Sequence, residues 1–119
     1  RTVRQILTGR LDPGSTRPMT TYDIIISSGM EIGEYGHVAV YVARTETDAD
    51  GRAEHDTVWV GEQRSVPVEE GDRLAVETLL AGDLAEAMRQ VPHAEWAEDQ
   101  TRTDAGYGGW RVLTGRSAA

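Results

Sequence analysis

The feature that most constrains this chain is a two-residue alternation that recurs in short segments separated by turns. It is clearest at 37–43, where three valines, Val38, Val40 and Val42, alternate with His37, Ala39, Tyr41 and Ala43. Successive side chains of a β-strand point to opposite faces, so this segment is predicted to be a strand. We expect its valine face to contact the core.

Further strands are predicted wherever the alternation, or a short apolar run, returns between turn residues. They lie at 21–26, 57–60, 66–68, 74–80 and 110–113. Asp48-Ala49-Asp50-Gly51 has the composition of a hairpin turn between two of them. Because most of these strands are joined by short turns, we expect antiparallel pairing.

One segment has helical rather than strand spacing. Asp83 followed by Glu86 is a capping-box pattern that favours a helix start, and Pro92 favours a helix end. Between them, apolar residues share one helical face: Leu84, Ala87, Met88 and Val91.

A second short helical turn is expected at 93–99, around Trp96. The predicted fold class is therefore mainly β. We expect a small antiparallel barrel or sandwich with one short α-helical insertion, at about residues 83–91, before the last strand.

Charge divides the chain into two parts. The 119 residues suit a single domain and carry a net charge of −8. Residues 1–18 hold four arginines against one aspartate, a net charge of +3, whereas the remainder holds 8 arginines against 19 acids, a net charge of −11. We therefore predict a basic N-terminal arm, 1–18, attached to one acidic β-rich domain, 19–119.

Composition excludes several classes of function. The acidic domain has no row of cations to neutralise phosphates, so nucleic-acid binding is not expected. No apolar run approaches the roughly 20 residues of a membrane span, so no membrane association is expected. The chain has no cysteine, which excludes disulfides and thiol chemistry and fits a reducing compartment, so a cytoplasmic location is expected.

Metal binding and other cofactors are not expected. His55 lies between Glu54 and Asp56, but neighbouring residues of a strand point to opposite faces and cannot grip one ion together. His93 can be joined by Glu95 or Glu98 at helical spacing, and two ligands do not make a site.

His37 and Tyr41 form the strongest catalytic candidate. They share one strand face with the small Ala39 between them, and Glu34 precedes them where the strand begins. Two polar rings beside small residues are typical of a cavity wall with groups that move or polarise protons. A solvent-exposed sheet face or a protein interface would have the same pattern.

Aromatic residues beside glycines suggest a ligand-covering loop. Tyr107 and Trp110 flank a glycine-rich segment, and Tyr35 lies beside the candidate strand. A loop of this kind can close over a bound small molecule.

The arm is the candidate partner-binding segment. Its apolar residues are Val3, Ile6, Leu7 and Leu11, which are too apolar for a solvated linker. Its positive charge complements the acidic domain. The arm could pack on its own domain, on a sister subunit or on another protein.

Two functions fit this sequence. The first is a non-catalytic interaction or assembly module, oligomeric or part of a larger complex, whose partner is another protein or a second copy. The alternative is a small β-barrel isomerase, cyclase or lyase that acts on an apolar small molecule in a central cavity, using His37, Tyr41 or Glu34.

Overall fold

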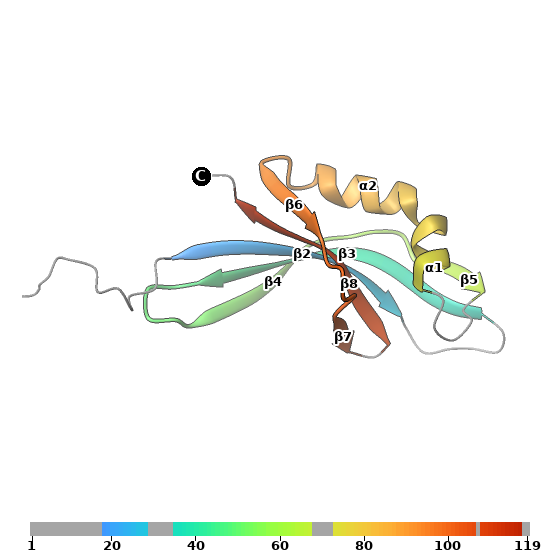
Figure 1. Cartoon of the computed structure of the whole chain (residues 1–119), viewed down its shortest axis with the longest axis horizontal. Helices are drawn as coiled ribbons and strands as arrows, with labels where there is room; N and C mark the ends of the chain where they lie inside the picture. Colours follow the sequence, from blue (N-terminus) through green and yellow to red (C-terminus); the bar gives the residue numbers. More distant parts are fainter. Residues whose placement is uncertain (1–17, 29–34, 68–72, 107, 118–119) are drawn as a thin grey trace, which may run out of the picture.

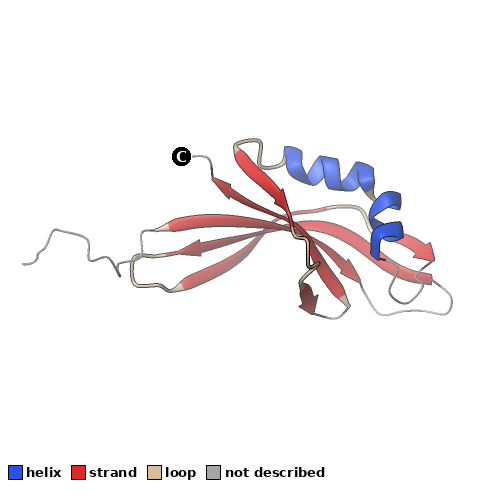
Figure 2. Cartoon of the chain, in the orientation of Figure 1, coloured by secondary structure: helices blue, strands red, loops and turns tan. Residues whose placement is uncertain are grey.

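The computed structural model describes residues 18–28, 35–67, 73–106 and 108–117. These residues form one antiparallel sheet and two short helices that lie together on one side of it (Figures 1 and 2). In chain order, the elements are β2 (Met19–Ser28), β3 (Tyr35–Thr47), β4 (Ala53–Val60), β5 (Arg64–Pro67), α1 (Arg73–Leu79), α2 (Ala81–Arg89), β6 (Ala94–Glu98), β7 (Asp104–Gly106) and β8 (Gly109–Ser117).

The sheet is open rather than closed into a barrel. Its strand order is β4-β3-β2-β8-β6, and the seven strands fill only five positions because each outer position is shared. β4 and β5 both pair with the outer side of β3, and β6 and β7 both pair with the outer side of β8. The prediction of a mainly β, antiparallel fold is confirmed, and the barrel or sandwich is corrected to a single open sheet.

The core lies between the sheet and the helices. In β2 and β3, Ile24 pairs with Val42 and Ile26 pairs with Val40, and these four side chains are fully buried. Val38 completes the valine face, which confirms the predicted orientation of this strand. Burying such a side chain stabilises the fold by roughly 1.5–3 kcal/mol, so this face specifies the register of the two central strands.

The hairpin between β3 and β4 forms where the turn residues predict it. The Asp48 side chain accepts hydrogen bonds from the backbone N–H groups of Asp50 and Arg52, each at 2.9 Å. Gly51 has φ +86°, a left-handed conformation that glycine adopts without steric cost. β4 begins at Ala53, four residues before the predicted start.

Segment 74–80 is largely helix α1, not the predicted strand. Its residues alternate as in a strand, but Val76 and Leu80 are four apart and are 3% and 1% exposed, whereas Leu74 and Leu79 are 66% and 60% exposed. Apolar residues four apart meet on one helical face. In so short a run the apolar residues fit both the two-residue period of a strand and the 3.6-residue period of a helix. Packing against the sheet selects the helix.

The predicted helix at 83–91 is present as α2, two residues earlier in the chain. Leu80 occupies its N-cap position without a side-chain cap, so the expected capping box is wrong. Asp83 instead accepts two hydrogen bonds from Arg64 of β5, which joins the helix to the sheet. With α1, the described residues contain two helices between β5 and β6 where one was predicted, and three strands, β6, β7 and β8, follow them rather than only the last strand.

Segment 93–99 contains strand β6 in place of the predicted helical turn. Trp96 pairs with Gly115 of β8, and a Cβ atom at Gly115 would lie 2.7 Å from the Trp96 ring. The indole therefore needs a glycine beneath it. Trp96 and Gly115 are 19 residues apart in the sequence. Their packing across two strands overrides the helical spacing of residues 93–99.

Candidate functional site

The side of the sheet opposite α1 and α2 is the candidate functional surface. We call it the open face. The register places on it Thr21, Asp23, Ile25 and Ser27 of β2, His37, Ala39, Tyr41, Ala43 and Thr45 of β3, His55, Thr57 and Val60 of β4, Ser65 of β5, Glu95 and Ala97 of β6, and Arg111, Thr114 and Arg116 of β8.

His37 and Tyr41 both lie on the open face, with Ala39 between them. His37 Nδ1 lies 3.2 Å from the Ser65 hydroxyl on the neighbouring strand. Burial, and to a smaller extent the negative charge of Asp23, raise the pKa of Tyr41. Its hydroxyl therefore stays protonated at neutral pH.

Several sequence candidates lie elsewhere. Trp110 is buried on the helix side of the sheet, away from Tyr41. The candidates that lie outside the described residues are Glu34, Tyr107, Val3, Ile6, Leu7 and Leu11, and the side chain of Tyr35 is likewise not described. Of the predicted catalytic and ligand-binding set, the structure places His37 and Tyr41 on one face of β3, four residues apart along the strand.

A buried ion pair joins α1 to the sheet. Glu77 accepts two hydrogen bonds of 2.7 Å from Arg102 and one of 2.9 Å from the indole N–H of Trp110. The Arg102 backbone has φ +51°, a left-handed conformation that is rare for residues with a side chain. The guanidinium of Arg73 lies 5.1 Å from the centre of the Trp110 ring and completes the cluster.

Asp99 organises the segment between β6 and β7 beside this ion pair. Its carboxylate accepts hydrogen bonds from the backbone and hydroxyl of Thr101, from the backbone of Thr103 and from Arg111 Nε at 2.8 Å. Burial alone would raise the pKa of Asp99, but these hydrogen bonds hold it well below its usual range. Asp99 thereby fixes Arg111 at the border of the open face.

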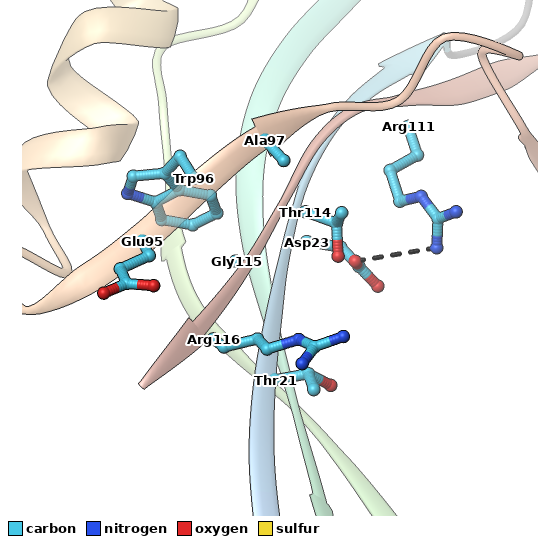
Figure 3. A pocket seen from close by; sticks show the side chains of 9 residues that line it. All are labelled: Thr21, Asp23, Glu95, Trp96, Ala97, Arg111, Thr114, Gly115 and Arg116. Atoms are coloured by element: carbon cyan, nitrogen blue, oxygen red, sulfur yellow. Dashed lines mark ion pairs between the residues drawn. The ribbon is translucent and has the colours of Figure 1, made fainter. Parts of the chain in front are cut away.

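A shallow pocket of about 570 Å³ lies on the open face where β2, β8 and β6 meet (Figure 3). Arg111 approaches Asp23 at 3.7 Å within it. Arg116 lines the other end and makes no ion pair or hydrogen bond with another described side chain. The lining residues are Thr21, Asp23, Glu95, Trp96, Ala97, Arg111, Thr114, Gly115 and Arg116.

Sequence reasoning missed this pocket. Asp23 and Arg111 are 88 residues apart, and only the antiparallel pairing of β2 with β8 brings them together. The alternation of Arg111, Thr114 and Arg116 with core residues was a weak signal, because it is interrupted by the irregular register between Ile24 and Ile25 of β2.

The open face differs from the rest of the molecule in charge. It carries two carboxylates, Asp23 and Glu95, and two guanidinium groups, Arg111 and Arg116, so its net charge is zero. The complete chain carries a net charge of −8. The described residues hold 8 arginines against 14 acids, a net charge of −6, so their excess of acids lies outside the open face.

Within the described residues, no three histidine, aspartate or glutamate side chains are grouped to hold a metal ion. None of the described helices has the length and apolar character needed to cross a membrane. Comparison with protein families, curated proteins and solved structures finds no match to this chain.

Proposed function

We propose that the protein is an assembly module in which the open faces of two copies pack against each other. The observation that carries the proposal is the charge of this face: it is neutral in a chain with a net charge of −8. Two acidic copies repel each other in most orientations, and the repulsion is smallest where neutral faces meet.

The centre of the open face is apolar and low in relief. Ile25 is 9% exposed; its neighbours on β3 are Ala39, Tyr41 and Ala43, and on β8 it pairs with Arg111. Val60, 60% exposed, extends this region onto β4. Small side chains let a second sheet approach to the roughly 10 Å at which sheets pack, and tyrosine is enriched at protein interfaces.

The charged residues suit a two-fold arrangement. In such an interface each patch meets its own copy, so acids of one subunit can reach cations of the other. Arg116, which has no charged partner among the described residues, is then available to a carboxylate of the second copy. This complementarity sets the orientation of the two sheets.

The face is large enough for such an interface. β2 and β3 contain 10 and 13 residues. At about 3.3 Å per residue and about 4.8 Å between strands, the five strand positions span on the order of 20 Å by 30 Å. This projected area is about 600 Å²; the solvent-accessible area of the same side chains exceeds their projection, which brings the face close to the roughly 800 Å² that each partner buries in a standard interface.

The alternative, a barrel enzyme with a central cavity, has less support. An open sheet does not enclose the barrel interior in which an apolar substrate would be held. The raised pKa of Tyr41 also keeps its hydroxyl protonated at neutral pH, so little tyrosinate is present to accept a proton.

The test is the oligomeric state of the full chain and of two matched variants. Ala43→Arg places a bulky cation at the centre of the open face, and Ala85→Arg makes the same change at an exposed position of α2. We expect dimers of the unmodified chain and of Ala85→Arg in sedimentation velocity at micromolar concentrations. Ala43→Arg should weaken association at least about tenfold.

A monomeric unmodified chain would overturn the proposal, as would an Ala43→Arg variant that associates like Ala85→Arg. Circular dichroism of each variant checks that it is folded. Because both substitutions add the same positive charge, a difference between them reports the position and not the charge.

A further inference from the structure

Arg116 lies where two hollows of the molecule meet. The shallow pocket between β2, β8 and β6 measures about 570 Å³, and a smaller hollow of about 330 Å³ lies beside it at the start of β2. Thr21 and Arg116 line both of them, so the two hollows adjoin. Their volumes are of the size that small-molecule sites have.

Asp23 is a partly buried carboxylate whose hydrogen-bonding capacity is unused. Its side chain is 25% exposed, and its one ion pair within the described residues is the contact with Arg111 at 3.7 Å. Arg111 is itself engaged elsewhere, because its Nε donates to Asp99 at 2.8 Å and its Nη2 lies 3.4 Å from the Thr103 hydroxyl. Carboxylates that are largely buried usually accept hydrogen bonds, so Asp23 is able to accept them from a bound molecule.

Arg116 provides the opposite charge in the same pocket. It lies opposite Thr21 of β2, two residues from Asp23 along that strand. In Figure 3 the Asp23 carboxylate and the Arg116 guanidinium extend to the same side of the strands. Among the described residues, these two groups form no ion pair with each other, and Arg116 forms none with any other side chain. The pocket therefore offers an acceptor and a cation that one ligand can reach together.

We propose that the two hollows bind a small zwitterion, an α-amino acid with an apolar side chain. Its ammonium group donates to Asp23 and its carboxylate accepts from Arg116, so both charges of the ligand have a partner. The lining of the pocket matches such a ligand because its two carboxylates and two guanidinium groups sum to zero. A simple anion or cation would instead leave an unbalanced charge in the pocket.

The smaller hollow accommodates the apolar side chain of the ligand. Pro18 and Met19 line it together with Arg116, and Met19 is 48% exposed. Met19 is two residues before Thr21 in β2, so both side chains lie on the same face of the strand. Methionine packs against apolar groups of different shapes, which suits the side chain of an amino acid held at Arg116.

This site goes beyond the proposed dimer and does not depend on it. All the residues that form it belong to one chain. Because the proposed dimer also uses Arg116, a bound amino acid and a second copy compete for that side chain. Binding is therefore measured at low protein concentration, where the monomer predominates.

A titration of the isotope-labelled full chain with leucine, followed by NMR chemical shifts, tests the inference. We expect saturable shifts of β2, β6 and β8 amides around the two hollows, with a Kd of about 1–10 mM for so shallow a site. Acetate and methylammonium each carry one of the two charges, and each should bind at least about tenfold more weakly. Glycine keeps both charges but lacks the side chain, and it should bind at least about threefold more weakly than leucine.

Substitutions assign the contacts. Arg116→Gln and Asp23→Asn each remove one charge and should weaken leucine binding at least about fivefold. Arg52→Gln and Asp50→Asn make the same two changes at exposed positions near the turn after β3 and should leave binding unchanged. Met19→Ser should weaken the binding of leucine and leave that of glycine unchanged. Circular dichroism checks that each variant is folded.

The inference would be overturned if about 50 mM leucine produced no saturable shifts. It would also be overturned if acetate bound as tightly as leucine, or if binding survived both Arg116→Gln and Asp23→Asn. Equal affinities for leucine and glycine would overturn the placement of the side chain in the smaller hollow.

Sedimentation velocity of the same samples separates this inference from the proposed dimer. A chain that binds leucine but stays monomeric at micromolar concentrations would support the binding site and contradict the dimer. A chain that dimerises without binding leucine would do the reverse.

Discussion

The two faces of the sheet are built from the same strands but differ in what covers them. On the helix side, Val40 and Val42 are fully buried beneath α1 and α2, whereas Tyr41, between them, lies on the uncovered side. One face is buried beneath the helices and the other is uncovered, as the proposed dimer requires. A single strand can border both environments because its residues alternate between the two faces.

The largest expected effect is on the covered face. Ile24→Ala removes buried methyl groups from the centre of the core and leaves a cavity there. We expect the free energy of unfolding to fall by roughly 3–4 kcal/mol. Urea unfolding measures it, and a loss below about 1 kcal/mol would show that this face is not the principal core.

The second effect concerns the ion pair that attaches α1 to the covered face. Glu77→Gln removes the more buried of the two carboxylates that pair with Arg102, leaving the half-exposed Glu98 at 2.8 Å, and keeps an acceptor for Trp110. We expect a loss of about 2–3 kcal/mol. In a double-mutant cycle with Arg102→Leu, the combined loss should be smaller than the sum, and additive losses would contradict coupling between the two residues.

The third effect depends on pH and concerns Asp99, at the border between the faces. Its pKa is lower in the folded protein than its ordinary value of 3.8, because the folded carboxylate accepts hydrogen bonds from Thr103, Arg111 and Thr101. The folded state therefore binds fewer protons than the unfolded state. This contribution to stability is complete above the ordinary pKa and is lost as the pH falls below it.

Thermal unfolding at several pH values tests this sign. We expect Asp99→Asn to be less stable than the unmodified chain at pH 7, and the difference to shrink as the pH falls below about 4. A difference that stays constant over this range would mean that the charge of Asp99 does not contribute.

The smallest effect is expected on the open face. His37→Ala removes an exposed contact with Ser65 and should change the free energy of unfolding by less than about 1 kcal/mol. Urea unfolding at low protein concentration keeps this measurement apart from any effect on association. If His37→Ala lowered the free energy of unfolding as much as Ile24→Ala, the two faces would contribute equally to stability, which would contradict the comparison.

Local patterns in the sequence predicted those elements whose period is unambiguous. The valines of β3 and the turn at Asp48 were identified because alternation and turn chemistry are properties of adjacent residues. Segments 74–80 and 93–99 were misassigned because each is short enough to satisfy two periods. In both, contacts with distant residues decide the outcome, through Leu80 in the core and Trp96 over Gly115.

Closure of the sheet and the composition of the pocket could not be derived from the sequence. Whether a sheet closes depends on which edges pair, and that is set by the register of strands far apart in the chain. His37 and Tyr41 belong to one strand, so the alternation of side chains was enough to predict that they share a face. The contact of Arg111 with Asp23 required the alignment of β8 with β2.

Position 102 faces two demands that conflict. Its left-handed backbone favours glycine or asparagine, while its side chain must reach Glu77 and the carbonyl oxygen of Asp99 with a branched cation. Glycine would relax the backbone and lose the ion pair; lysine would keep a charge but lose the paired hydrogen bonds and retain the strain. In a saturation scan, this residue should therefore tolerate almost no replacement, although it lies in a connecting segment, where substitutions are usually accepted.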